Sequence, residues 1–360
     1  MKFRLISIIT ALSLLFSSAL SGCGRNNNAT SGIKVGMVVD SGTIDDKSFN
    51  QNTWEGITKY EKENGTIESK YLQPSGEQET DFITAINDLI DSGYNLIVTT
   101  GKKFETAVNK AAEQHPDISI ILLDGEPSNG TEYVKHDNVI SILFADQEAG
   151  FLAGVAAALS SGSGKVGFIG GSQIAPVERF GVGYKAGVKY ANATYGTNVQ
   201  IVDFVYQGTF NDPASGQTLA SGMYDKGIDI IFHAAGGTGV GVFNEAKERA
   251  EKGQKVYVVG VDLDQYDTGK ISTGKSVTLT SAMKRLDNAV YKYIDAKVNN
   301  SFQGGETIIL SAADDGVGLP DTNPNLSEDT INKINETKQN LADGRLKIPS
   351  TESELNSFLK

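Results

Sequence analysis

Carboxylates and an aromatic ring follow several of the apolar runs that read as β-strands. Asp40, Asp124 and Asp262 each come directly after such a run, and Phe210 comes shortly after another. An aspartate in this position is, taken alone, more often a helix cap or part of an Asx turn. The repeated placement at strand ends instead favours a binding site made of hydrogen-bond acceptors and aromatic ring faces.

Little in the sequence supports catalysis. Its three histidines and one cysteine fit no zinc-protease spacing, and no G-x-S-x-G nucleophile motif is present. His233 ends an apolar run, where a buried structural histidine is the more common case. The pair Asp45–Asp46 is the nearest approach to a carboxylate cluster, and a helix N-terminus explains it more simply. We therefore expect a protein that is not an enzyme and has no cofactor and no metal.

Two glycine-rich segments resemble nucleotide-binding loops. Gly269–Ser276 matches the Walker A string, but a P-loop needs a strand directly before it and a helix directly after it. Here the preceding strand ends near Val261, and Val277–Thr280 again has a strand-like composition. Gly236–Gly241 lacks the spacing of a dinucleotide loop, so we expect it to approach some ligand closely but not to bind NAD.

Short β-branched runs alternate with amphipathic stretches from residue 33 onward. This alternation predicts parallel sheets covered by helices. About nine strands are predicted before residue 262, and they fall into two separate series. This indicates an α/β fold with two doubly wound, Rossmann-like lobes joined by crossover strands. The predicted strands are 33–39, 67–72, 95–99, 119–123, 139–144, 165–169, 200–206, 228–233 and 255–261, and the predicted helices include 49–64, 146–159, 177–195, 214–224 and 241–251.

The boundaries of the two lobes follow from the points at which we expect the chain to pass from one lobe to the other. We expect an N-terminal lobe of residues 33–143 plus about 263–303, and a C-terminal lobe of residues 144–262 plus about 304–360. In open α/β sheets, ligands bind beyond the carboxyl ends of the strands. With two such lobes facing each other, the site should be the cleft between them.

The N-terminus has the features of a secretory signal. Lys2 and Arg4 precede an apolar run of about 16 residues, which is shorter than the roughly 20 that a spanning helix needs. Leu20–Cys23 then resembles a bacterial lipobox. We expect residues 1–22 to be a signal peptide and Cys23 to be lipidated. Residues 23–32 would be a polar tether, and the protein would be anchored outside the cell membrane.

The net charge of −12 limits the choice of partners. Residues 1–22 carry two basic residues and no acidic one, so the remainder is near −14. An acidic surface argues against a nucleic-acid partner. The single cysteine excludes an internal disulfide, so the stability of the fold must come from its core.

Five motifs, in order, resemble the basic membrane protein (BMP) family of lipoproteins. They are Asp45–Gln51, Glu148–Gly154, His233–Gly239, Gly260–Gln265 and Ser281–Lys284, and the resemblance extends from about residue 33 to 320. The family is similar to type I periplasmic binding proteins, and its characterised members bind nucleosides for an ABC transporter. The resemblance therefore implies a nucleoside ligand of the purine type and an ABC permease as partner, and we expect the protein to be monomeric.

The resemblance also implies contacts to the base. The positions that match the two aromatic rings of such a receptor are Phe49 and Phe210, which would sandwich the base. Asp40 and Asn50 would meet its polar edge. Stacking a base on an aromatic side chain is worth about 1–3 kcal/mol, so two rings would supply much of the affinity.

The remaining implied contacts concern the sugar and the backbone. Asp124, Asp262 and Lys284 would hold the ribose hydroxyls or nearby ring atoms, which suits carboxylate acceptors and a lysine donor. Gly237 and Thr238 would allow the backbone to approach the ligand closely. Asp146 and Glu178 are weaker candidates.

Three alternatives remain open at this point: a sugar or other small polar metabolite as ligand, an exported enzyme that acts on nucleosides, and an adhesive surface lipoprotein. A nucleotide would meet several carboxylates and one lysine, and we expect repulsion to exclude it.

Overall fold

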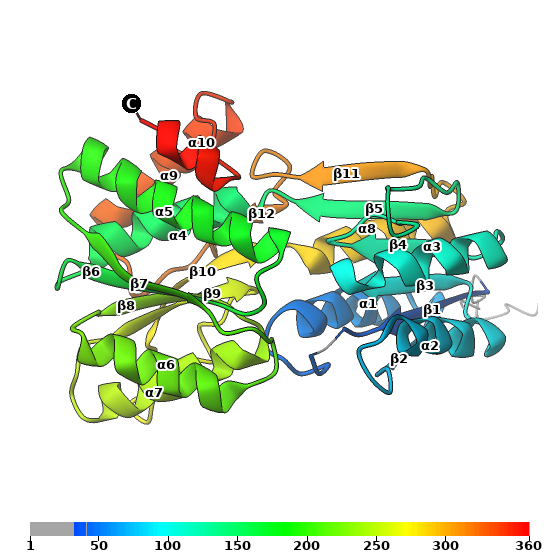
Figure 1. Ribbon diagram of the computed structural model, residues 1–360, viewed down its shortest axis with the longest axis horizontal. Coiled ribbons are helices and arrows are strands. Elements are labelled where there is room, and N and C mark those ends of the chain that lie inside the picture. Colours follow the sequence, from blue (N-terminus) through cyan, green and yellow to red (C-terminus); the bar gives the residue numbers. More distant parts are fainter. Residues whose placement is uncertain (1–31, 41, 360) are drawn as a thin grey trace, which may run out of the picture.

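The computed structural model describes residues 32–40 and 42–359. The signal peptide, Cys23 and most of the tether lie outside the described residues. The described chain forms two α/β lobes, each built on its own six-stranded sheet. Figure 1 shows the lobes side by side along the long axis of the molecule. The two doubly wound, Rossmann-like lobes that the sequence predicted are therefore confirmed.

The N-terminal lobe has a sheet in which every pair of neighbouring strands is parallel, in the order β11-β5-β4-β3-β1-β2. Helices α1 and α8 pack on one face, and α2, η1 and α3 pack on the other. Because both faces are covered, the central strands are buried along their whole length. The elements are β1 (Ile33–Val38), α1 (Phe49–Asn64), β2 (Ile67–Leu72), α2 (Glu79–Asp91), β3 (Leu96–Thr100), η1 (Lys102–Phe104), α3 (Glu105–Gln114), β4 (Ser119–Leu123), β5 (Val139–Phe144), α8 (Leu286–Val298) and β11 (Glu306–Leu310).

The C-terminal lobe repeats this plan in the order β12-β10-β9-β8-β6-β7, and only the short edge strand β12 is antiparallel to its neighbour. Helices α4 and α5 cover one face, with α9 and α10 outside them, and α6 and α7 cover the other. The elements are α4 (Asp146–Ser160), β6 (Lys165–Gly170), α5 (Ala175–Tyr195), β7 (Gln200–Tyr206), α6 (Pro213–Asp225), β8 (Ile230–Ala234), α7 (Gly237–Glu251), β9 (Tyr257–Asp262), β10 (Thr278–Lys284), β12 (Val317–Gly318), α9 (Glu328–Ala342) and α10 (Glu352–Ser357).

The strand pairing corrects two of the expected lobe boundaries. The segment after residue 262 does not return to the N-terminal lobe at once, because β10 pairs with β9 in the C-terminal sheet. The chain crosses only after Lys284. In turn, β11 pairs with β5, so residues 306–310 belong to the N-terminal sheet and the last crossing follows them. The composition of β10 and of β11 would allow either strand to join either sheet. Only the long-range pairing determines which sheet each strand joins.

The glycines of the Glu148–Gly154 motif bring α4 and α5 into backbone contact. A Cβ atom on Gly150 would lie 2.3 Å from the carbonyl oxygen of Phe180, and one on Gly154 would lie 2.4 Å from that of Tyr184. Glycine is therefore required at both positions for the two helices to pack this closely. This motif serves the architecture of the C-terminal lobe.

The Walker-like segment forms a turn between two strands. Ile271 N donates to the carbonyl of Lys275, and β10 follows. The strand-before and helix-after context of a P-loop is therefore lacking. The run that starts at Gly236 does follow a strand and opens α7. Within residues 32–40 and 42–359, no helix is both long enough and apolar enough to cross a membrane.

Candidate functional site

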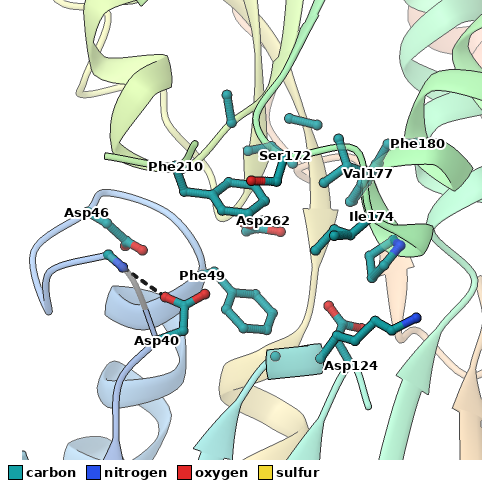
Figure 2. Close-up of a pocket in the computed structure, with 18 of the residues that line it drawn as sticks. Asp40, Asp46, Phe49, Asp124, Ser172, Ile174, Val177, Phe180, Phe210 and Asp262 are labelled. Carbon is teal, nitrogen blue, oxygen red and sulfur yellow. Dashed lines mark hydrogen bonds between the residues drawn. The ribbon is translucent and has the colours of Figure 1, made fainter. Parts of the chain in front are cut away.

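A cleft of about 910 Å³, open to solvent at its mouth, lies between the lobes. Its walls come from the carboxyl ends of strands in both sheets and from the loops that follow them. This is where ligands bind in open α/β sheets. Figure 2 shows the side chains that converge on this cleft.

Two phenylalanines reach the cleft from opposite lobes. Phe49 is the first residue of α1 in the N-terminal lobe, and Phe210 lies in the loop between β7 and α6 of the C-terminal lobe. Both are half-buried. Figure 2 shows the two rings with open space beside them. A Cβ atom on Gly171 would lie 2.4 Å from the Phe210 ring, so this glycine provides the room in which the ring is seated.

Lys284 links the two lobes at the floor of the cleft. It ends β10, and its side chain is only 2% exposed. Its Nζ atom pairs with Oδ2 of Asp124, which follows β4 of the N-terminal lobe, and lies 2.8 Å from Oδ1 of Asp146. Burial alone would lower the pKa of Lys284, but the charges of Asp124, Asp146 and Asp262 outweigh burial and raise it. The lysine is therefore held as a cation.

Asp146 is in turn held by Arg179 on α5. The Nε and Nη2 atoms of Arg179 donate to Asp146 Oδ2 at 3.0 and 2.7 Å. Asp146 is fully buried, does not line the cleft and pairs with both Arg179 and Lys284. Glu178, the other weaker candidate, accepts a hydrogen bond from Gln173 and also lies outside the cleft lining.

Asp124 and Asp262 both have left-handed backbone conformations, with φ of 53° and 66°. This region is uncommon for residues other than glycine and tends to occur at functional sites. Both aspartates are buried and line the cleft. Asp124 Oδ1 has no hydrogen-bond partner within the described chain, whereas Asp262 Oδ2 accepts from the Ser48 hydroxyl of the other lobe.

The charge of Asp262 gives a pH-dependent prediction. Burial raises the pKa of Asp262 from 3.8 to about 7. Between these values the folded protein keeps a proton that the unfolded chain has lost, so this residue makes the protein less stable as the pH rises from about 4 to about 7. Its contribution has a slope of at most about 1.4 kcal/mol per pH unit.

The Asp262→Asn variant lacks this titration and keeps an acceptor for Ser48. We expect its free energy of unfolding in urea to fall less steeply with pH over that window than that of the wild type. Because Asp46, Asp124 and Lys284 face Asp262 in both proteins, the difference between the two curves reports the titration of Asp262 together with its coupling to these groups. Parallel curves would show that Asp262 is ionised throughout.

Asn50 supports the acidic end of the cleft from behind. Its Nδ2 atom donates to Asp40 Oδ1 at 2.9 Å and to Asp46 Oδ2 at 3.1 Å, and its Oδ1 atom accepts from the Thr100 hydroxyl at 3.0 Å. Asp46 also accepts from the backbone N–H groups of Ser48, Asn50 and Gln51 at the start of α1. Asn50 and Asp46 therefore have their polar groups occupied within the protein.

Six of the nine predicted site positions line the cleft: Asp40, Phe49, Asp124, Phe210, Asp262 and Lys284. The structure differs for the other three. Asn50 is buried behind Asp40, and Thr238 is fully buried with its hydroxyl bonded to the carbonyl of Thr209. Gly237 begins α7 directly after Gly236, and only Gly236 lines the cleft.

Sequence reasoning missed one wall of the cleft. Ser172, Ile174, Val177 and Phe180, from the β6–α5 loop and the first turns of α5, line it (Figure 2). Apolar residues at a helix start look like core residues in a sequence, so no signal marked them.

Two rim lysines correct the expectation of a single lysine. Lys102 and Lys103 also line the cleft, and Lys103 pairs with Glu77 at 2.6 Å. Lys103 lowers the pKa of Asp40, but burial outweighs this effect and raises the pKa above its ordinary value.

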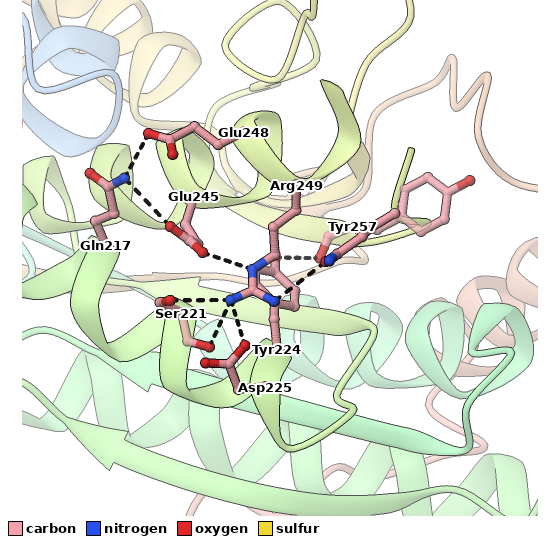
Figure 3. A network of polar contacts seen from close by, with 9 residues as sticks. Gln217, Ser221, Tyr224, Asp225, Glu245, Glu248, Arg249 and Tyr257 are labelled. Carbon is pink, nitrogen blue, oxygen red and sulfur yellow. Dashed lines mark hydrogen bonds and ion pairs between the residues drawn. The ribbon is translucent and has the colours of Figure 1, made fainter. Parts of the chain in front are cut away.

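A second polar network serves only to hold two helices together. Figure 3 shows Arg249 of α7 between Glu245, at 2.7 Å, and Asp225 of α6, at 2.8 Å. The Tyr224 hydroxyl donates to the carbonyl of Tyr257 next to them. None of these residues lines the cleft, so the network fixes α6 against α7 and the sheet behind them.

Comparisons with known proteins agree with this architecture. The Bmp family model, described as "ABC transporter substrate-binding protein PnrA-like", matches residues 33–352. The "CD4+ T-cell-stimulating antigen" of Listeria monocytogenes is 39% identical over 369 residues, which covers 97% of this chain and 99% of that protein. The "ABC transporter nucleoside-binding protein BmpA" of Lactococcus lactis is 32% identical over 364 residues, covering 97% and 100%.

A solved structure supports the same assignment. The crystal structure of an ABC transporter solute-binding protein from Aeropyrum pernix is 28% identical, with a TM-score of 0.77, over 90% of this chain and 96% of that one. The family and this neighbour are binding proteins and not enzymes. The chain therefore belongs to the Bmp family of PnrA-like ABC transporter substrate-binding proteins.

Proposed function

We propose that the protein captures nucleosides in the interlobe cleft and delivers them to an ABC importer. The observation that carries this proposal is the pair of rings, Phe49 and Phe210, which reach one cleft from opposite lobes. A nucleobase has two π faces, and a ring on each wall matches both of them. Closing of the lobes about the crossovers would bring the rings onto the base.

The floor of the cleft suits the sugar. Asp124 Oδ1 is buried without a hydrogen-bond partner in the described chain, next to the ammonium group of Lys284. A buried acceptor without a donor is costly, and a ribose hydroxyl would supply the donor. Lys284 can donate to a sugar oxygen in the same place.

We also propose that a lipid on Cys23 holds the protein on the outer face of the cell membrane. The support is the basic tip, the short apolar run and the small residues before the only cysteine. A membrane-bound receptor stays close to its permease. Mass spectrometry of the N-terminal peptide from membranes would show a chain that starts at acylated Cys23, and an unmodified cysteine would contradict the anchor.

Titration calorimetry tests the ligand class. We expect adenosine, guanosine or inosine to bind. Ribose should bind at least about 100-fold more weakly, because it has no aromatic base to stack on the phenylalanine rings. Adenosine 5′-monophosphate is expected to bind more weakly than adenosine, because its phosphate, which is on the ribose, would approach the carboxyl groups of Asp124 and Asp262.

The same panel separates the alternatives. Ribose binding as tightly as any nucleoside would point to a sugar receptor, and the monophosphate binding as tightly as adenosine would contradict the acidic-cleft argument. Small molecules extracted from the natively purified protein and identified by mass spectrometry give an independent check of the ligand class.

A further inference from the structure

Gln265 connects the two lobes from outside the lining of the cleft. It follows β9 in the C-terminal lobe and is fully buried. Its Nε2 atom donates a hydrogen bond to the backbone carbonyl of Lys47, which lies just before α1 in the N-terminal lobe. Lys47 has a left-handed backbone conformation, with φ of 57°. A residue with a side chain keeps this conformation only where its surroundings impose it, and this hydrogen bond, here called the interlobe tie, is one such contact.

The partners of Gln265 fix which way its amide group points. Its Oε1 atom accepts from the backbone N–H of Val261 at 2.9 Å, and this group can only donate. The carbonyl of Lys47 can only accept. The oxygen of the amide therefore faces the C-terminal lobe, and its NH₂ group faces the N-terminal lobe.

His233 is a second donor to the same oxygen. Its Nε2 atom lies 3.1 Å from Gln265 Oε1, and burial lowers the pKa of the ring to about 4, so the ring is neutral at neutral pH. Because the partner is an acceptor, Nε2 carries the single ring proton. A Cβ atom on Gly239 would lie 2.1 Å from Nδ1 of this ring, so the glycine leaves the space that the ring occupies. Two residues of the His233–Gly239 motif therefore serve to orient Gln265.

The segment that the interlobe tie holds carries one of the two rings of the cleft. Phe49 comes two residues after Lys47. The residue between them, Ser48, also contacts the C-terminal lobe, because its hydroxyl donates to Asp262 Oδ2. A rotation that moved the lobes apart there would break both hydrogen bonds and move the Phe49 ring away from the C-terminal lobe.

We propose, on the basis of the nucleoside site above, that His233 and Gln265 are positioning residues: His233 orients Gln265, and Gln265 holds the segment with Phe49 against the C-terminal lobe while a nucleoside is bound. Neither residue lines the cleft, so the interlobe tie acts on the ligand only through the protein. Its loss should therefore weaken the binding of every nucleoside by the same factor. The effect should fall mainly on dissociation, because the occupied cleft would open more easily.

Gln265→Met tests the interlobe tie, since methionine fills a similar volume but cannot donate to Lys47. Gln265→Glu is the second variant, because it keeps an oxygen for its own lobe and, when ionised, places an acceptor against the Lys47 carbonyl. We expect titration calorimetry to show about 5- to 100-fold weaker binding, by the same factor for adenosine and for inosine. Dissociation rates measured by surface plasmon resonance should rise by a similar factor.

Gln339→Met is the matched control, because Gln339 is exposed on α9 and donates to the nearby Asp343. It should leave both affinities unchanged. His233→Phe keeps a ring but removes the donor to Gln265, so both nucleosides should bind about 2- to 10-fold more weakly. His233→Gln, whose amide can restore that donor, should bind more tightly than His233→Phe. Circular dichroism and thermal melting establish that each variant is folded.

The outcomes separate this inference from the proposed function. If folded Gln265→Met and Gln265→Glu both bind as the wild type does, or lose affinity by different factors for the two nucleosides, the inference is wrong while nucleoside binding stands. A loss confined to thermal stability and to the fraction of active protein would show that Gln265 is only structural, and would also overturn it. A wild-type protein that binds no nucleoside would overturn the proposed function and this inference together.

Discussion

Phe49→Ala and Phe210→Ala are each expected to weaken nucleoside binding by about 5- to 150-fold, because stacking a base on one aromatic side chain is worth about 1–3 kcal/mol. The double variant should lose more than either single variant. Both rings line the cleft and are half-buried, so their removal should cost little of the core. Titration calorimetry with adenosine measures the loss.

Folding must be followed in the same samples. Circular dichroism and thermal melting should show folded variants, and Tyr133→Ala, which removes a ring that is 59% exposed and outside the cleft lining, should bind as the wild type does. A Phe49→Ala variant that unfolds would show that this ring is part of the core. Unchanged affinity in both single variants would remove the basis of the proposed site.

Lys284→Met is expected to cause the largest loss of stability. The substitution leaves Asp124 and Asp146 buried with one cation fewer, and removing one partner of a buried ion pair typically costs about 3–5 kcal/mol. Urea unfolding of the ligand-free protein measures this loss. The double variant Lys284→Met with Asp124→Asn should recover part of it, since Arg179 still pairs with Asp146.

Lys333→Met is the matched control, because it removes a lysine from an exposed i,i+4 pair with Asp329. Surface pairs of this kind contribute about 0–1 kcal/mol. If Lys284→Met is no less stable than Lys333→Met, the buried pairing of Lys284 with Asp124 does not hold the two lobes as described.

The elements were predictable because their signals are local. The predicted strands 67–72, 119–123, 139–144 and 200–206 and the helix 49–64 coincide with those observed. Apolar runs and helical periodicity act over a few residues, so one sequence shows them. Which lobe contains β10 or β11 depends instead on long-range strand pairing. For these two strands the expected lobe boundaries near residues 263 and 304 were wrong.

The candidate site was predictable where its polar residues come directly after a predicted strand. Asp124 and Asp262 could be found this way because the carboxyl ends of parallel strands meet at the cleft. Asn50 lies behind Asp40 and outside the cleft lining, and its residue type does not show that neighbouring carboxylates accept hydrogen bonds from its amide. Arg179 went unnoticed because only the three-dimensional structure places it behind Asp146.

The most direct test of the central claim is a crystal structure of the protein with adenosine. We predict that the base lies between Phe49 and Phe210, with the ribose hydroxyls at Asp124 and Lys284 and the polar edge of the base toward Asp40. A base bound away from both rings, or a nucleoside bound outside the interlobe cleft, would contradict the account.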